Sequence, residues 1–110
     1  MNKDYIVKKN YEIQKIIKNN KKLSSKYFVV YYINNKGIHD RYCISISKKI
    51  GNAVIRNTYK RKIKDILMKN NFNKNCDYVI IVKKSILNES YDNIKNDLVK
   101  ILNGEEDEKK

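Results

Sequence analysis

The sequence is poor in the residues from which many metal centres and active sites are built. Its 110 residues include two cysteines, one histidine and three glycines, and no proline or tryptophan. Cys43 and Cys76 do not form a C-x-x-C pair, whereas a zinc site needs about four Cys or His ligands at local spacing. The chain therefore cannot assemble such a site. We expect both cysteines to serve as small apolar side chains in a reduced protein.

Long apolar segments are also missing. The longest unbroken apolar run, 27–33, has seven residues, whereas a membrane-spanning helix needs about 20. The first five residues contain no apolar segment or small-residue cleavage site of the kind that a signal peptide carries. We therefore expect a cytoplasmic protein that does not enter a membrane.

Few groups are available for catalysis by protein side chains. The chain contains neither G-x-x-x-x-G-K-[ST] nor G-x-G-x-x-G, the two common glycine-rich phosphate-binding motifs. A metal-dependent nuclease needs two or three converging carboxylates. The acidic residues before position 80 instead fall on different predicted elements: Asp4, Glu12, Asp40, Asp65 and Asp77. The only histidine, His39, lies in a predicted turn, so we assign no catalytic residue.

Basic residues are abundant and unevenly distributed. Lys and Arg total 25 against 12 Asp and Glu, a net charge of +13. Residues 1–76 hold 19 basic and 4 acidic side chains, a net of +15, while 77–110 hold 6 and 8. Together with nine tyrosines, this excess indicates phosphate attraction and stacking surfaces for nucleic acid. Of only three arginines, Arg56 and Arg61 lie close together, which indicates a need for a bidentate guanidinium there.

The pattern of apolar residues predicts an α+β sandwich in one domain over 1–104. A charged tail at 105–110, which we expect to be disordered, follows it. Helices are predicted over about 10–19, 55–70 and 91–103, with Asn10 and Ser90 as N-caps. Strands are predicted over 26–33, 41–47 and 77–83, and the loop 19–25 could hold a short edge strand. Turn residues at 34–37 predict that the first two long strands form a hairpin. The apolar run 78–82 predicts a central strand.

Alternation along the strand 41–47 divides its side chains between two faces of the sheet. The residues at 42, 44 and 46 point to one face, and Cys43, Ser45 and Ser47 point to the other. The second face also carries three residues of the preceding strand: Tyr27, Val29 and Tyr31. We expect this shallow, partly polar face to be a docking surface rather than a core.

The segment 48–64 combines basic residues with a glycine-bearing loop and the N-terminus of a predicted helix. Free N–H groups and the helix dipole at such a terminus favour phosphate. We predict RNA contacts for nine of its residues: Lys48, Lys49, Gly51, Asn52, Arg56, Asn57, Lys60, Arg61 and Lys64. Helical spacing places the last four in one sector beside the apolar stripe of the helix, with Arg56 at the sector's N-terminal edge.

This segment carries a family resemblance. The residues Ser45-Ile-Ser-Lys-Lys-Ile-Gly-Asn-Ala-Val-Ile-Arg-Asn-Thr-Tyr-Lys-Arg resemble the K-K-x-G-x-A-V-x-R-N-x-x-K-R signature of the bacterial ribonuclease P protein subunit. The resemblance extends over about 8–103. It implies an αβββαβα fold with a mixed four-stranded sheet, a left-handed βαβ crossover through the motif helix, and a likeness to domains of ribosomal and translation proteins.

The resemblance also implies a function. Members of the family bind the catalytic RNA subunit of ribonuclease P, which removes the 5′ leader of precursor tRNA. The RNA, with divalent metal ions, performs the hydrolysis. The implied partners are therefore this RNA and precursor tRNA, with no small-molecule substrate. The implied cofactor is Mg²⁺ at the level of the holoenzyme, with no metal held by a protein motif.

Positions carried over from the family place a leader-binding cleft between the first helix and the sheet. The cleft residues would be Ile13, Ile17, Val29, Tyr31 and Ser45, with Tyr31 the best candidate for stacking on a base. Four residues depart from the family pattern. Thr58 stands where an arginine is typical, and Lys64 where an arginine is common. Ile13 and Ile17 fill positions that are often phenylalanine.

Two other functions remain open from the residues alone. A general RNA-binding or ribosome-associated protein without a role in tRNA processing would account for the basic composition. A protein-only nuclease would account for RNA binding but is disfavoured by the scattered carboxylates. The signature favours the ribonuclease P subunit over both.

Overall fold

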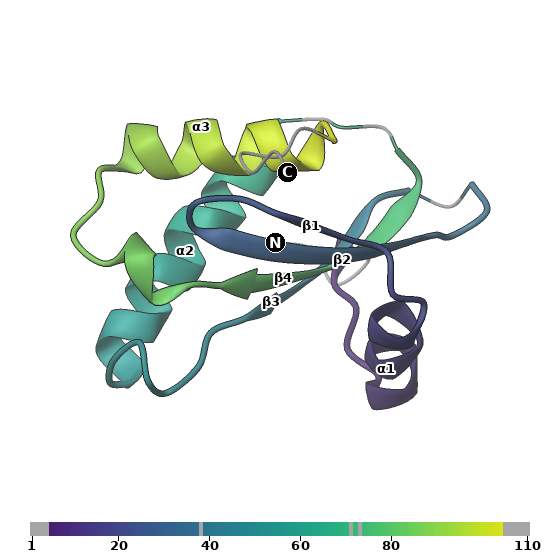
Figure 1. Ribbon diagram of the computed structural model, residues 1–110, viewed down its shortest axis with the longest axis horizontal. Helices are drawn as coiled ribbons and strands as arrows, with labels where there is room; N and C mark the ends of the chain where they lie inside the picture. Colours follow the sequence, from purple (N-terminus) through teal and green to yellow (C-terminus); the bar gives the residue numbers. More distant parts are fainter. Residues whose placement is uncertain (1–4, 38, 71, 73, 105–110) are drawn as a thin grey trace.

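A four-stranded mixed sheet is the centre of the fold, with two helices on one face and a short helix on the other (Figure 1). The computed structural model describes residues 5–37, 39–70, 72 and 74–104. The charged tail 105–110 therefore lies outside the described residues. Along the chain the elements are α1 (Asn10–Lys18), β1 (Lys22–Ser24), β2 (Phe28–Asn34), β3 (Arg41–Ser45), α2 (Ala53–Lys69), β4 (Cys76–Val82), a 3₁₀ turn (Lys84–Ile86) and α3 (Tyr91–Leu102).

The strand order is β1-β2-β4-β3, so β4 is central, as its apolar sequence predicts. It pairs antiparallel with β2 and parallel with β3. The predicted hairpin between β2 and β3 is wrong, because β4 lies between them. The turn itself forms, with positive φ at Lys36 and Gly37. Turn residues determine that the chain reverses, but β4, with its apolar run from Tyr78 to Val82, is the strand that gains most from burial on both faces.

Helices α2 and α3 cover one face of the sheet and form the main core with it. The predicted stripe of α2 is buried at every position: Tyr59, Ile63, Ile66 and Leu67. The stripe predicted for α3 comprises Tyr91, Ile94, Leu98, Ile101 and Leu102; the last four are buried in the same way, whereas Tyr91 is only half-buried. Each large apolar side chain that is fully buried contributes about 1.5–3 kcal/mol. The βαβ unit β3–α2–β4 is the one for which the resemblance predicts a left-handed crossover.

Helix α1 lies on the opposite face and covers it only in part. Ile16 of α1 and Val7 pack against Val79 of β4 in a second, smaller cluster. Val29 and Ile81 remain half-buried and Ser45 is exposed. This face therefore has a covered part under α1 and an open part beside it.

The helix ends differ in one place from expectation. Ser90 is the N-cap of α3 as predicted, and its hydroxyl accepts the Asn93 N–H at 3.1 Å. Asn10, in contrast, is the first residue of α1, and Lys9 is the N-cap without a side-chain bond. The backbone carbonyl of Lys9 already accepts N–H groups from Glu12 and Ile13, so the backbone of Asn10 is inside the helix.

The cysteines occupy the environments expected for small apolar side chains. Cys43 and Cys76 are both free and partly buried, each packed against one of the two clusters. Burial raises the pKa of both thiols, which keeps them protonated at neutral pH. In the described part of the chain, no helix combines the length and the apolar character that crossing a membrane requires.

Candidate nucleic-acid interface

Four basic residues of α2, together with Asn57, form two neighbouring rows along the helix. Side chains four residues apart are neighbours on a helix surface, so Arg56, Lys60 and Lys64 make one row. Asn57 and Arg61 make the second row beside it. In the described residues, none of these cations is paired with a carboxylate. We call this set, together with residues 48–52, the α2 basic surface.

The loop before α2 is shaped by local hydrogen bonds. The Ser47 Oγ accepts the Lys49 N–H at 3.1 Å, and the Ser47 carbonyl accepts the Ile50 N–H at 3.0 Å. Ile50 is buried, which anchors the loop and leaves Lys48 and Lys49 exposed. These contacts hold the two lysines beside the N-terminus of α2, where the dipole favours an anion.

Gly51 and Asn52 set the start of α2 rather than adding charge. A Cβ on Gly51 would lie 2.9 Å from Ile55 Cγ2, so only glycine permits this approach of the loop to the helix. The Asn52 Oδ1 accepts the Ile55 N–H at 3.0 Å, which makes Asn52 the N-cap. Both residues therefore position the basic side chains around them.

Arg56 has an unusual donor. Its Nε is buried and has no hydrogen-bond partner, although buried polar groups are generally paired. The residue as a whole is partly exposed. A planar guanidinium in this state can take a bidentate acceptor such as a phosphate.

The α2 basic surface reaches the edge of the sheet at β3. Burial raises the pKa of Cys43, and the positive charge of Lys60 opposes this rise. β3 ends at Ser45, and the loop that carries the exposed Lys48 and Lys49 follows it directly. The basic side chains and the open part of the sheet are neighbours.

The predicted cleft residues come together on that open part of the sheet. The register places Val29 opposite Ile81 and Ile81 opposite Ser45, in one row across three strands. Tyr31 lies in the next row, and Ile13 and Ile17 of α1 pack beside it. All five predicted residues thus share one region: Ile13, Ile17, Val29, Tyr31 and Ser45.

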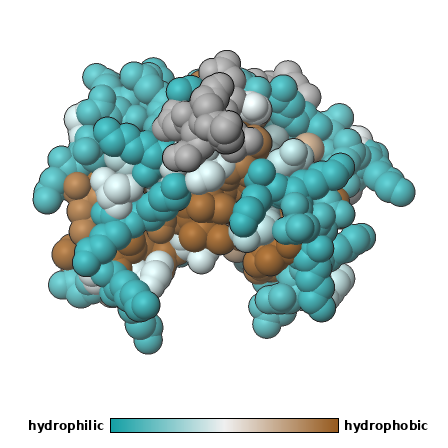
Figure 2. All heavy atoms as spheres, viewed as in Figure 1, coloured by the Kyte–Doolittle hydropathy of each residue, from teal (hydrophilic) through white to brown (hydrophobic). Residues whose placement is uncertain are grey.

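Figure 2 shows this region as a hollow with apolar surface between two hydrophilic projections at the lower margin. Comparison with Figure 1 identifies the projections as α1 on one side and the loop before α2 on the other. We call the hollow the central cleft. Its two walls carry lysines and its floor is apolar, an arrangement that suits a strand with charged phosphates and flat bases.

Sequence reasoning missed one contributor to the central cleft and misplaced another residue. Ile81 of β4 lies half-buried in its floor, and it was missed because β4 was not expected between β2 and β3. Tyr27 was expected on this face but is 2% exposed in the main core. It precedes β2, and its backbone N–H bonds to Asp97 at 3.0 Å, so strand alternation does not apply to it.

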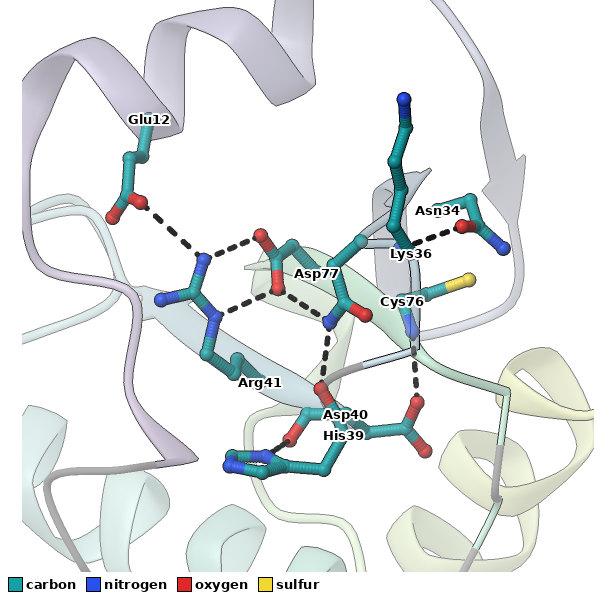
Figure 3. Close-up of polar contacts among 9 residues, drawn as sticks. Glu12, Asn34, Lys36, His39, Asp40, Arg41, Cys76 and Asp77 are labelled. Atoms are coloured by element: carbon teal, nitrogen blue, oxygen red, sulfur yellow. Dashed lines mark hydrogen bonds and ion pairs between the residues drawn. The ribbon is translucent and has the colours of Figure 1, made fainter.

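A network around Arg41 joins α1 to the sheet (Figure 3). The Arg41 guanidinium donates to both carboxylate oxygens of Asp77, at 2.9 and 2.7 Å, and reaches Glu12 of α1 at 3.4 Å. The Asn35 side chain donates to Asp77 at 3.0 Å. This network was not predicted, because its members are distant in sequence and carry no motif.

The network alters the ionisation of Asp77. Burial alone would raise the pKa of this carboxyl, but hydrogen bonds from Arg41 and Asn35, and the Arg41 charge, together lower it. The same contacts raise the pKa of Arg41 further above its ordinary value. Both groups are therefore charged at neutral pH and fix one wall of the central cleft.

The buried carboxylates are engaged inside the fold. Asp40 accepts the backbone N–H groups of Cys76 and Lys74, at 3.0 and 3.3 Å. Asp97 accepts the Ser25 hydroxyl at 2.7 Å. Over the residues that the structure describes, no three His, Cys, Asp or Glu side chains gather to form a metal site. Asp40 and Asp97 fix loops.

Comparison with known proteins gives consistent matches over nearly the whole chain. The family model described as Ribonuclease P matches residues 1–105. The ribonuclease P protein component of Mycoplasma capricolum subsp. capricolum is 42% identical over 101 residues, covering 88% of this chain and 92% of that protein.

Two solved structures of the RNase P protein from Staphylococcus aureus have the same fold. One is 38% identical with a TM-score of 0.79, covering 89% of this chain and 92% of that chain. The other, described as a mutant with defective mRNA degradation activity, is 36% identical with a TM-score of 0.82, covering 91% and 86%.

Proposed function

The chain belongs to the ribonuclease P protein family, and on this premise we propose how it works as the protein component of that tRNA-processing ribonucleoprotein. The α2 basic surface binds the catalytic RNA. The central cleft binds the single-stranded 5′ leader of precursor tRNA. The observation that carries the proposal is the position of the α2 basic surface, whose cations have no carboxylate partner in the described residues, beside an apolar cleft (Figure 2).

The assignment of the α2 basic surface to RNA rests on unpaired charge. Cations that already pair with carboxylates have little to gain from phosphate, whereas those of the α2 basic surface have no such partner in the described residues. Arg56 in particular keeps a buried donor without an acceptor. Neutralising phosphates releases counterions, so each such contact adds affinity that falls with salt.

The assignment of the central cleft to the leader rests on its shape and chemistry. Its floor is formed by half-buried apolar side chains of β2 and β4 with the ring of Tyr31 beside them. The Nζ of Lys22 lies 5.7 Å from the centre of that ring. A base stacked on Tyr31 would therefore have a cation close to its adjoining phosphate. Unpaired bases stack on aromatic rings, whereas paired bases are not accessible to them.

We further propose that the divalent ions used in cleavage, with Mg²⁺ as the expected ion, are bound by RNA and not by carboxylates of this chain. Asp40, Asp77 and Asp97 are buried and take hydrogen bonds from the protein itself. The protein then acts by binding and orienting RNA, and the cleavage chemistry is performed by the RNA subunit.

The proposal is tested by cleavage of precursor tRNA at low Mg²⁺ by a bacterial catalytic RNA, with and without this protein. We expect the protein to rescue cleavage at the correct 5′ site. Binding without rescue would instead favour a general RNA-binding protein. The protein with Mg²⁺ but without catalytic RNA should leave precursor tRNA intact, and cleavage under those conditions would favour a protein nuclease.

Tyr31 provides the sharpest test of the central cleft. Tyr31→Ala should weaken holoenzyme binding to leader-bearing precursor tRNA by about 5- to 150-fold, because base–aromatic stacking is worth about 1–3 kcal/mol. Binding to mature tRNA and to the catalytic RNA should not change. Tyr31→Phe keeps the ring and should behave as the original protein. An equal loss on precursor and mature tRNA would remove Tyr31 from the leader site.

A further inference from the structure

Helix α1 borders a second hollow, distinct from the central cleft. It has a volume of about 720 Å³ and is lined by Asn10, Tyr11, Gln14, Lys15, Lys18 and Asn19, with Ile33 of β2 at its base. Tyr11 is 67% exposed, whereas Ile13, Ile16 and Ile17 of the same helix pack on the sheet. We call this region the α1 hollow.

The α1 hollow adjoins the central cleft around the surface of the helix. At about 100° per residue, Asn10 lies about 20° from Ile17, and Gln14 about 60° from it. Ile17 is one of the cleft residues. A strand that passes over Ile17 therefore meets Asn10 and Gln14 next, and then Tyr11, Lys15 and Lys18.

The lining of the α1 hollow has the chemistry of a nucleotide site. It combines an accessible aromatic ring, three side-chain amides that can donate and accept hydrogen bonds, and two lysines. It contains no acidic residue. The acidic residue of this helix, Glu12, faces the opposite flank and is held by Arg41, so it does not repel a phosphate here.

The accessible ring is oriented by a cation rather than buried. The Nζ of Lys9 lies over the Tyr11 ring at 5.9 Å, and the remainder of the ring faces solvent. An aromatic ring flanked by lysines binds an unpaired base by stacking while the lysines meet the adjoining phosphates. A base-paired RNA would present no free base to this ring.

We propose that the α1 hollow is a second single-stranded RNA site, which binds leader nucleotides that lie further from the cleavage site than those in the central cleft. Tyr11 stacks on a base, Lys15 and Lys18 contact phosphates, and Gln14 hydrogen-bonds to a base edge. This inference rests on the proposed function, because it takes the leader to run through the central cleft.

The test uses the reconstituted holoenzyme and precursor tRNAs whose leaders are lengthened one nucleotide at a time. Affinity should rise in two stages as the leader first fills the cleft and then reaches α1. Tyr11→Ala should abolish the second stage with a loss of about tenfold for long leaders, and leave short leaders unaffected. Lys15→Ala with Lys18→Ala should reduce the salt slope for long leaders by about 1.4, because each lost contact to a single strand accounts for about 0.7.

Two variants control for folding and for general charge. Tyr11→Phe keeps the ring and should retain the second stage. Lys95→Ala removes an exposed cation of α3, on the other face of the sheet, and should change neither stage. The midpoint of thermal unfolding of Tyr11→Ala should match that of the original protein, since the side chain is mostly exposed.

The outcomes separate this inference from the proposed function. If Tyr31→Ala weakens leader binding but Tyr11→Ala does not, the α1 hollow is not a leader site while the central cleft remains one. If Tyr11→Ala weakens mature tRNA as much as long-leader precursor, the hollow contacts another part of the RNA and the inference is wrong. If neither variant lowers the affinity for leader-bearing precursor tRNA more than the affinity for mature tRNA, both proposals fail.

Discussion

The three arginines occupy two different environments although they carry the same charge. Arg41 forms a bidentate ion pair with Asp77, which fixes its side chain within the fold. Arg56 and Arg61 lie on one surface of α2 and have no carboxylate partner among the described residues. A guanidinium with an internal partner stabilises the fold, whereas one without a partner is available to an external anion. Proximity in sequence identified the second pair, and only contact distances identified the first.

This difference predicts how the motif arginines act. Replacing Arg56 and Arg61 by Ala should weaken binding to the catalytic RNA and lower the salt slope of log affinity by about one for each lost phosphate contact. The measurement is a binding titration over a range of salt concentrations.

The lysine variants separate charge from geometry. Arg56→Lys with Arg61→Lys should keep most of the slope but lose affinity, because Lys carries the charge without the bidentate fork. Lys95→Ala on α3 serves as the control for net charge. A slope that does not change in the double alanine variant would contradict the assignment of both arginines to phosphate.

At the scale of the element, the N-terminus of α2 combines an N-cap, a tight contact between the preceding loop and the helix, and a cluster of cations. Asn52 supplies the cap and Gly51 the close approach to Ile55. Later in the helix the Thr58 hydroxyl donates to the Val54 carbonyl at 2.9 Å, so the residue that replaces a typical arginine contacts the helix backbone. The start of α2 thus depends on side chains that hydrogen-bond to the helix backbone as much as on its basic residues.

The capping residues allow a matched comparison. Asn52→Ala and Ser90→Ala each remove one N-cap bond, from α2 and α3, and each should lower the free energy of unfolding by about 0.5–2 kcal/mol. Denaturant unfolding measures this loss. Only Asn52→Ala should also weaken catalytic-RNA binding, because Ser90 is not part of the α2 basic surface. Equal effects of the two variants on RNA binding would show that the loop before α2 has no specific role.

At the scale of the whole molecule, the Arg41 network holds α1 against the sheet and so sets the width of the central cleft. It connects α1, β3, β4 and the turn after β2 through Glu12, Arg41, Asp77 and Asn35. The side chain of Asp77 is 10% exposed, so its interaction with Arg41 is weakly screened. Removal of one partner would leave a buried charge without compensation, which typically costs 3–5 kcal/mol, as a rough guide.

The ionisation of Asp77 predicts a pH dependence of stability. Its pKa is lower in the folded protein than the ordinary value of about 3.9 in the unfolded chain. The stabilisation is therefore complete above pH of about 4–5 and is lost as the pH falls through the folded pKa, because protonation removes the acceptor of Arg41. Unfolding free energies measured from neutral to acidic pH should fall in this window.

Two variants test whether this pH dependence of stability comes from Asp77. Asp77→Asn should lower stability at neutral pH and flatten its decline in acid. Asp65→Asn is the matched control, since hydrogen bonds from Tyr91 and Lys69 lower the pKa of Asp65 as well, but its side chain is 43% exposed. Its effect should be smaller. An unchanged acid profile in Asp77→Asn would show that other carboxylates dominate.

Local features of this protein could be predicted from its sequence by itself. The apolar stripes of α2 and α3, the Ser90 cap, the central β4 and the basic segment before and along α2 all depend on residues within a few positions of one another. Periodicity, capping and charge clustering report such short-range relations directly. The signature around residues 48–61 added the family and, with it, the expectation of a left-handed crossover.

Only the tertiary structure decided which distant residues meet. The position of β4 between β2 and β3 brought Ile81 into the central cleft and excluded the expected hairpin. The pair of Arg41 and Asp77, 36 positions apart, and the α1 hollow depend on the same arrangement. The physical reason is that strand pairing and burial are settled by competition among all apolar segments of the chain. No window of neighbouring residues contains that competition.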